Sequence, residues 1–233
     1  IRLIARLLRH HEPILLQREV TKADARKEVI ELLGLVGIPE PEQRIDSYTF
    51  ELSGGMRQRA MIAMALAKRP SLLIADEPTT AIDVTIQAQI LELLADLQQR
   101  LNMATLIITH NLGVVANLAD RVAVMYLGRI VEYGTVDEIF HDPRHPYTVG
   151  LVNSIPKLNE WETRELWSIK GVVPPPHVTI PGCPFHPRCH RFMKGLCDTV
   201  RPIMVEVAKG HGAECLLYGK PETGEEESKA ENR

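Results

Sequence analysis

Three polar side chains follow apolar runs in this sequence, at places where they could act on a phosphate. Asp76 and Glu77 come directly after Leu72–Ala75, and His110 ends the run "MATLIITH". A carboxylate at the end of a buried parallel strand lies where open α/β sheets bind ligands. Asp76 could hold Mg²⁺, and Glu77 could orient or deprotonate a water. His110 could contact a terminal phosphate, although a single histidine at a strand end is more often an ordinary hydrogen-bonding residue.

A third stretch, "SGGMRQR", has the form of a helix start that binds an anion. Ser53, Gly54 and Gly55 precede a predicted helix, rich in Ala and Met, that runs over Met56–Arg69. The start of a helix carries free N–H groups and partial positive charge, and glycine lets a phosphate approach the backbone closely. Taken alone, Ser-Gly-Gly would indicate only a serine N-cap.

The elements that must position these residues follow the order strand, helix, strand. Apolar runs at 71–76, 103–110 and 120–128 are typical of parallel strands covered on both faces. Val84–Leu101 has apolar residues at helical spacing between the first two runs. This order predicts a βαβ unit in an α/β core, with the two carboxylates and the histidine at the same end of neighbouring strands.

The first fifty residues are predicted to be mostly helical. In "TKADARKEVIELLGLVGI", Thr21 and Asp24 have capping-box spacing and Gly37 can close the helix. The segment "IRLIARLLRH" is amphipathic and basic. It fits a surface helix with solvated arginines better than a helix lying on a membrane, because it is short.

Composition excludes several classes of protein. The net charge of −3 and a pI near 6.3 give no basic field for nucleic acid. No apolar run approaches the roughly 20 residues of a membrane-spanning helix, and the sequence has no signal-peptide pattern.

From about Pro143 the composition shifts, and the stretch "GVVPPPHVTIPGCPFHPRC" (171–189), rich in proline and glycine, predicts irregular structure. Four cysteines lie close together in and after this stretch. They are Cys183, Cys189, Cys197 and Cys215. Their spacing, C-x5-C-x7-C-x17-C, is not the paired CxxC of common zinc modules, but their proximity favours a common ligand set. Zinc, with His186 or His190 replacing a cysteine, and free structural thiols both remain open.

Several longer stretches together resemble one family. "LSGGMRQR", "LLIADEPTTAID" and "LIITHNLGVVA" resemble the signature motif, Walker B, D-loop and switch histidine of ATP-binding cassette (ABC) ATPases. With "FHDPRHPYTVGL" they resemble the ATPase subunits of oligopeptide/dipeptide importers, a group that includes nickel importers. The resemblance implies an α/β, P-loop NTPase-like core. It covers about residues 1–220 and divides them into a helical subdomain (1–52), the C-terminal part of the ATPase core (53–142) and a cysteine-containing extension (143–220). The polar, charged composition of 221–233 predicts a disordered tail.

The resemblance also implies roles for these residues. The residues implied to meet the γ-phosphate of ATP held by a partner subunit are Ser53, Gly54, Gly55 and Gln58. Asp76 would serve Mg²⁺, Glu77 would be the general base, Asp83 would be the D-loop acid at the dimer interface, and His110 would sense the γ-phosphate. The cysteine set would carry a [4Fe–4S] cluster, with zinc as the alternative.

The implied partners are a second ABC ATPase subunit, identical or different, two membrane permease subunits and, indirectly, an extracytoplasmic solute-binding protein. No nucleic acid is expected. The protein would lie peripherally at the cytoplasmic face of the inner membrane, and its cargo would be peptide by default, with nickel or another small solute open.

One motif of the family is missing from this sequence. GxxxxGK[ST] does not occur, and the single Gly-Lys pair, Gly219-Lys220, is followed by Pro221. We therefore expect the C-terminal part of a longer ATPase, inactive by itself. A non-enzymatic metal-binding or regulatory remnant is one alternative, and a soluble cassette ATPase of DNA repair or translation is a weaker one.

Overall fold

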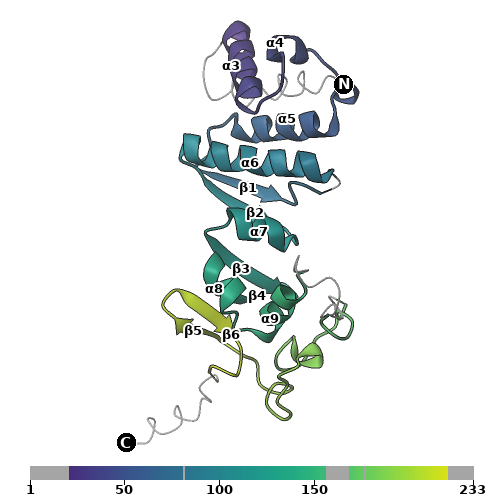
Figure 1. Cartoon of the computed structure of the whole chain (residues 1–233), viewed down its shortest axis with the longest axis vertical. Helices are drawn as coiled ribbons and strands as arrows, with labels where there is room; N and C mark the ends of the chain where they lie inside the picture. The colour runs from purple at the N-terminus through teal and green to yellow at the C-terminus, as the bar shows by residue number, and fades with distance from the viewer. Residues whose placement is uncertain (1–20, 81, 156–167, 176, 220–233) are drawn as a thin grey trace, which may run out of the picture. The chain divides into compact units, whose positions relative to one another are not determined.

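The structure is a computed structural model that describes residues 21–80, 82–155, 168–175 and 177–219. Contacts divide the chain into two compact units, 1–111 and 112–233, which are described separately (Figure 1). The predicted basic helix at the N-terminus and the predicted disordered tail both lie outside the described residues. The predicted domain boundaries stay predictions.

The first unit is mostly helical at its start and then alternates strand, helix and strand. Its elements are α3 (Lys22–Leu35), α4 (Pro41–Arg44), the 3₁₀ turn η1 (Thr49–Glu51), α5 (Gly54–Leu66), β1 (Leu72–Asp76), α6 (Val84–Leu101) and β2 (Ala104–Ile108). Thr21 caps α3 by accepting a hydrogen bond from the Asp24 N–H at 3.2 Å, which confirms the predicted helix start.

Strands β1 and β2 pair in parallel, as the βαβ pattern predicts. Leu72 lies beside Ala104 at one end of the pair, and Asp76 lies beside Ile108 at the other. Helix α6 connects the two strands, and α5 lies beside α6 (Figure 1). The carboxyl ends of the two strands therefore meet at one edge.

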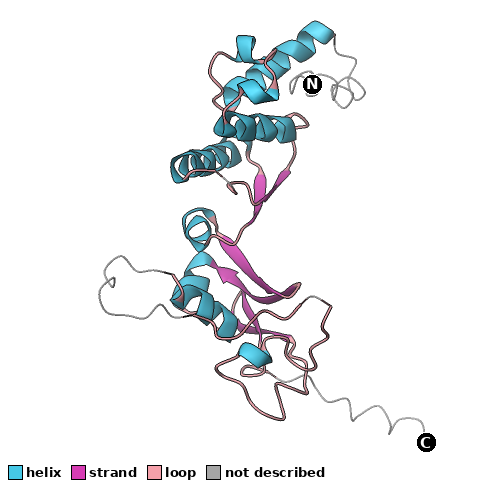
Figure 2. Cartoon of the chain, turned by 90° about the vertical axis from the view of Figure 1, so that its right-hand side faces the viewer, coloured by secondary structure: helices cyan, strands magenta, loops and turns pink. Residues whose placement is uncertain are grey.

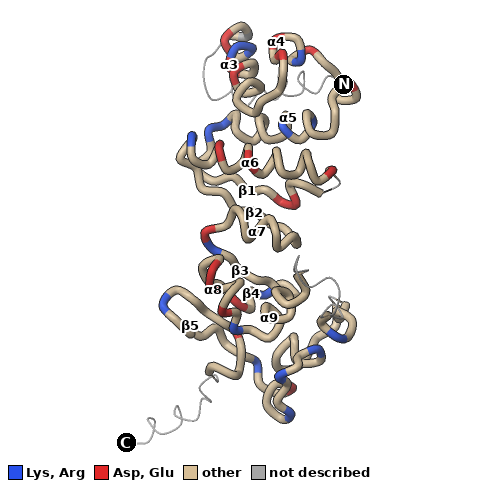
Figure 3. Tube along the Cα trace, in the orientation of Figure 1, with Lys and Arg blue, Asp and Glu red and all other residues tan. Residues whose placement is uncertain are grey.

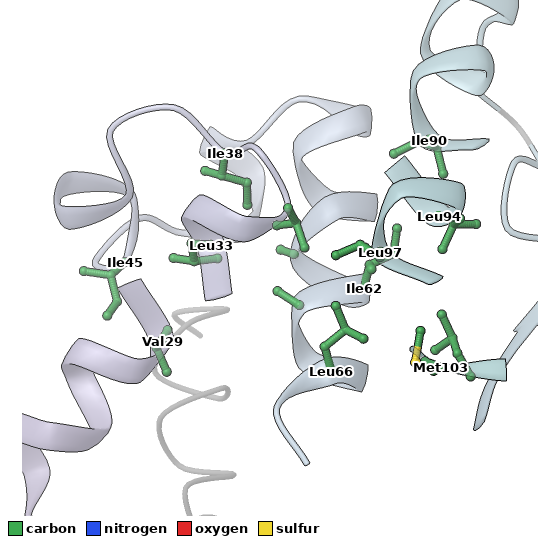
Figure 4. Close-up of a cluster of buried hydrophobic side chains, with 14 residues drawn as sticks. Val29, Leu33, Ile38, Ile45, Ile62, Leu66, Ile90, Leu94, Leu97 and Met103 are labelled. Atoms are coloured by element: carbon green, nitrogen blue, oxygen red, sulfur yellow. The ribbon is translucent and has the colours of Figure 1, made fainter. Parts of the chain in front are cut away.

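An apolar cluster holds the helices of this unit against β1. Its side chains come from α3, α5, α6, β1 and the segments that connect the elements (Figure 4). Those buried to 3% exposure or less include Val29, Leu33, Val36, Ile38, Ile45, Ala60, Ala63, Leu66, Ile90, Leu94, Leu97 and Met103. Burial of each large side chain contributes about 1.5–3 kcal/mol before the cost of ordering the chain.

The prediction that these strands are covered on both faces is wrong. Leu73 is buried, but its neighbours on the opposite face are exposed: Leu72 by 50%, Ile74 by 60%, Leu106 by 49% and Ile108 by 48%. Successive side chains of a strand point to opposite faces. The cluster therefore covers only one face of the β1–β2 pair.

The second unit contains a four-stranded antiparallel sheet in the order β3-β4-β6-β5. Its elements are α7 (Leu112–Leu118), β3 (Arg121–Tyr126), β4 (Arg129–Thr135), α8 (Val136–His141), α9 (Pro146–Asn153), the 3₁₀ turn η2 (His186–Arg188), β5 (Met204–Ala208) and β6 (His211–Glu214). Figure 2 shows the strands of the sheet beside helices, and loop residues on either side of η2. The irregular structure predicted for 171–189 is confirmed for the described residues of that stretch, which form loops, turns and the short η2, whereas α9, β5 and β6 are regular elements after Pro143.

The third apolar run was predicted to join the parallel strands, and this is also wrong. It forms β3, which pairs with β4 in the antiparallel sheet. Leu127 and Gly128 join the two strands with φ of 46° and 77°. Two positive φ angles suit a tight two-residue hairpin, so the chain turns back immediately after Tyr126.

Charged residues of both signs are spread through both units in the part of the chain that the structure describes (Figure 3). This spread agrees with the small net charge and gives no basic stripe among the described residues. Within the same residues, the helices are too short or too polar for any of them to span a bilayer.

Candidate active site

The ends of β1 and β2 bring the predicted acid and histidine together. Glu77 Oε1 lies 2.6 Å from His110 Nδ1. The Glu77 N–H donates to the carbonyl of Ile108 at 2.9 Å, and this bond fixes Glu77 at the edge of the sheet. Asp76 is exposed at the end of β1. The predicted common location is confirmed, and the roles of these residues stay predictions.

Both carboxylate oxygens of Glu77 have a partner. Oε1 contacts His110, and the Thr80 hydroxyl donates to Oε2 at 2.8 Å. The turn that brings Thr80 there holds Glu77 at a φ of 46°, and the Thr80 N–H donates to the Glu77 carbonyl at 3.2 Å. The hydrogen bond from His110 and then the one from Thr80 lower the pKa of Glu77. An ionised carboxylate of this kind can orient a water and accept its proton.

Sequence reasoning missed Thr80. The only signal for it was its position three residues after Glu77, across Pro78. That spacing permits a turn in which a hydroxyl reaches back to the carboxylate, but it does not identify one.

Ser53 begins α5 and serves as its N-cap. Its Oγ accepts a hydrogen bond from the Met56 N–H at 3.2 Å. Ser53 and Gly54 are exposed, and the first turn of this 13-residue helix has no acidic residue. The cap and the anion-binding interpretation are compatible, because one N–H group satisfied by a cap leaves other N–H groups of the first turn available.

Gln58 connects the same helix to the turn after β1. Its Nε2 donates to the carbonyl of Pro78 at 2.6 Å in a partly buried contact. The two residues are 20 positions apart, and no periodic pattern relates them. One amide N–H is therefore used within the chain, while the amide oxygen and the second N–H have no bond in the described structure.

The predicted D-loop acid lies at the start of α6. Asp83 Oδ1 accepts a hydrogen bond from the Ile86 N–H at 2.9 Å and so caps the helix. Ile86 in turn packs against Gly55, where an added Cβ would lie 2.8 Å from Ile86 Cγ2. The starts of α5 and α6, which carry the predicted signature and D-loop residues, are therefore in direct contact.

In the second unit, all four cysteines line one small cavity together with His145 and Phe185. The Cys183 N–H donates to the Cys197 carbonyl at 2.8 Å. Gly182 has a φ of 65° and lies against the backbone of Cys197, where no side chain would fit. These backbone contacts bring Cys183 and Cys197 to the same wall.

Three of the four thiols that line this cavity favour their protonated form. Burial raises the pKa of Cys183, and it raises the pKa values of Cys189 and Cys215 to about 11. The cavity volume is only about 10 Å³, close to the minimum that holds one water. Among the described residues, no three His, Cys, Asp or Glu side chains are arranged to hold a metal ion. The four cysteine sulfurs are suitable ligands for the predicted iron–sulfur cluster, but the cavity would have to widen to hold it.

A buried carboxylate that the sequence did not reveal supports the wall of this cavity. Glu132, on β4, accepts hydrogen bonds from the Arg144 N–H at 2.7 Å, the His145 N–H at 2.8 Å and His211 Nε2 at 2.8 Å. His145 Nδ1 accepts from the Tyr147 N–H at 3.1 Å, which caps α9. Burial lowers the pKa of His145 to about 4, so the ring is neutral at physiological pH.

Two family models match the chain. The model described as "ABC transporter" matches residues 4–80, and the model described as "Oligopeptide/dipeptide transporter, C-terminal region" matches residues 131–197.

Curated relatives from Bacillus subtilis (strain 168) match most of the chain. The oligopeptide transport ATP-binding protein OppD is 60% identical over 73% of this chain and 47% of its own length. The oligopeptide transport ATP-binding protein AppD is 50% identical over 93% of this chain and 65% of its own. The dipeptide transport ATP-binding protein DppD is 50% identical over 88% of this chain and 61% of its own length. The chain thus spans about half to two thirds of the length of these relatives.

A solved structure agrees with the fold. An inward-facing ABC transporter described as of metal-chelate type matches with a TM-score of 0.55 and 23% identity, over 65% of this chain and 57% of that one. At this identity the likeness concerns the fold alone, and it confirms the predicted α/β class.

Proposed function

Because the chain belongs to the ATP-binding proteins of ABC transporters, in the group with the oligopeptide/dipeptide C-terminal region, we propose that it forms part of an ATPase that drives peptide import. The observation that carries this proposal is the contact of Glu77 with His110 at the ends of two parallel strands. Nickel or another small solute is the alternative cargo.

In this proposal the strand-end residues act on the terminal phosphate of ATP. Glu77, ionised and held by Thr80, orients the attacking water and accepts its proton. His110 has an 84% exposed side chain, so its ring can contact the phosphate. Asp76 is exposed beside them and would hold Mg²⁺, which supplies positive charge to the phosphate oxygens when bound.

The start of α5 serves a different ATP, held by the partner ATPase subunit. Ser53, Gly54 and Gly55 offer N–H groups at the positive end of a helix, and the free part of the Gln58 amide lies one turn further on. Asp83, at the start of α6, would lie at the interface between the two subunits. Each subunit thus contributes a different half to each ATP site.

The remaining partners follow from the same proposal. The ATPase subunits would bind two membrane permease subunits at the cytoplasmic face of the membrane, and a solute-binding protein would deliver the cargo outside. The segment 1–52 is proposed as the helical part that contacts the permeases, 53–142 as ATPase core and 143–220 as the extension.

The extension supports a second, narrower proposal, that the four cysteines bind a metal group. The support is that all four line one cavity, and thiolates are the usual ligands of a [4Fe–4S] cluster. Zinc is the alternative.

Anaerobic purification with iron, zinc and sulfide analysis tests whether the four cysteines bind a metal group. Iron and sulfide near four each per chain, lost on Cys189→Ser, would support the cluster, whereas a colourless protein without either metal would exclude both groups.

Glu77→Gln tests the ATPase proposal in the complete transporter that contains this chain, reconstituted in vesicles. Removing the general base should lower ATP turnover by about 10²- to 10⁴-fold while ATP binding is retained. Glu92→Gln, on the exposed face of α6, is the matched control and should keep normal turnover. Unchanged turnover in Glu77→Gln would contradict the proposal, and failure to co-purify with permease subunits would favour a soluble or regulatory role.

A further inference from the structure

The hydrogen bond of Gln58 joins two motifs that serve different ATP molecules in the proposed dimer. Gln58 lies on α5, whose start would meet the partner's ATP, and its Nε2 donates to Pro78 at 2.6 Å. Pro78 is the buried residue that follows Glu77. A movement of α5 would therefore be transmitted to the backbone beside the general base.

The turn at Pro78 determines where the Glu77 carboxylate lies. Glu77 has a positive φ of 46°, which is uncommon for a residue with a side chain. The turn closes with Thr80 bonded to both the Glu77 carbonyl and its carboxylate. A shift of the Pro78 carbonyl would alter this turn and with it the position of the carboxylate.

A second contact fixes α5 against the start of α6, at the far end of the segment that runs from Glu77 to Ile86. Gly55 packs on Ile86 so closely that a methyl group would not fit, and Asp83 caps the helix that carries Ile86. The start of α5 is thus attached near both ends of the segment from Glu77 to Ile86, once by a hydrogen bond and once by packing.

From these contacts we propose that Gln58 is a positioning residue that couples the two ATP sites of the dimer. Engagement of the α5 start by one ATP sets the Pro78 turn, and this turn places Glu77 at the other ATP. In this role Gln58 acts through Glu77, in addition to the contact proposed above between its free amide atoms and the partner's ATP. The inference rests on the proposed ATPase function.

Three substitutions in the complete reconstituted transporter test the coupling. Gln58→Glu keeps the shape of the side chain but removes the donor to Pro78 when ionised. Gln58→Lys keeps a donor that can reach the carbonyl. Gln89→Glu, on the exposed face of α6, introduces the same charge away from both motifs and is the control.

We expect Gln58→Glu to lower kcat for ATP about tenfold, with KM nearly unchanged, because a partly buried carbonyl loses its donor. The Hill coefficient for ATP should fall towards one. Gln58→Lys should lose less kcat than Gln58→Glu, because it keeps a donor, and the control Gln89→Glu should match the parent. In a Glu77→Gln background, Gln58→Glu should cost little more in single-turnover rate, because it acts through that carboxylate.

Several outcomes would overturn the inference. A raised KM with unchanged kcat and Hill coefficient would make Gln58 only an ATP contact. Equal losses of kcat in Gln58→Glu and Gln58→Lys would show that the donor is not the cause. An undiminished effect of Gln58→Glu in the Glu77→Gln background would show that Gln58 does not act through Glu77. If the parent has no ATP turnover, or Glu77→Gln leaves it unchanged, the proposed function itself fails, and the coupling fails with it.

Discussion

Single buried polar residues determine how the second unit is held together. Glu132 is fully buried and receives hydrogen bonds from the segment before α9 and from His211 on β6. A buried carboxylate with three donors is stable only while all its partners remain, because each donor left unpaired in the interior is costly.

Replacing Glu132 with alanine should therefore destabilise the chain strongly. We expect the free energy of unfolding to fall by about 3–5 kcal/mol, since the substitution leaves buried donors unpaired. Glu132→Gln keeps one acceptor oxygen and should lose less. Urea denaturation followed by circular dichroism measures this, with exposed Glu92→Ala as the control; a loss below about 1 kcal/mol for Glu132→Ala would contradict the assigned role.

His145 predicts a dependence of stability on pH. Burial lowers its folded pKa to about 4, below the unfolded value of 6.5, so the unfolded chain binds the proton more readily. Its contribution is complete above pH 6.5 and is lost as the pH falls towards 4, by up to roughly 3 kcal/mol. His145→Asn keeps an acceptor for the Tyr147 N–H but does not titrate. The stability of this variant should therefore fall less than that of the parent chain between pH 6.5 and 4. Identical pH profiles for the two proteins in urea denaturation would refute the prediction.

At the scale of elements, the starts of α5 and α6 form one packed unit. Ser53 and Asp83 cap the two helices, and Gly55 and Ile86 meet between them. The backbone at position 55 is ordinary helix, in which alanine would be more favourable than glycine. The contact with Ile86 is therefore the reason that position 55 requires glycine.

Gly55→Ala should consequently destabilise the chain by about 1–3 kcal/mol, because the added methyl group overlaps Ile86. Adding Ile86→Ala should recover part of this loss by making room. Gly34→Ala in α3 is the matched control, since nothing lies within 4 Å of its added methyl group, and it should be neutral or stabilising by up to about 1 kcal/mol. Thermal unfolding distinguishes these cases, and equal effects at the two glycines would contradict the packing argument.

At the scale of the whole molecule, one face of the β1–β2 pair is apolar and exposed. Leu72, Ile74, Leu106 and Ile108 together present this face. A contiguous apolar surface of this kind favours association with another surface or with itself.

Ile74→Thr combined with Ile108→Thr should make the isolated chain less prone to aggregate and lower its binding of a hydrophobic dye. Threonine keeps the β-branched shape while removing apolar area from the surface. Leu73→Thr, on the buried face, should instead destabilise the chain and increase dye binding. Static light scattering measures aggregation, and dye fluorescence measures the exposed apolar surface. If the double variant and Leu73→Thr behaved alike, the exposure of the face that carries Ile74 and Ile108 would be contradicted.

Local pattern was enough to predict helices α3, α5 and α6 and the βαβ order, but not α7, α8 or α9. It also predicted the meeting of Glu77 with His110, because strand ends of a parallel pair share one edge. The same pattern could not reveal that β3 leaves that sheet, or that one face of β1 and β2 is exposed, because burial depends on which elements pack nearby. Gln58 with Pro78, Gly55 with Ile86 and Glu132 with His211 are contacts between residues that no periodicity relates. Such contacts exist only once the helices and strands are packed, so the tertiary structure alone decides them.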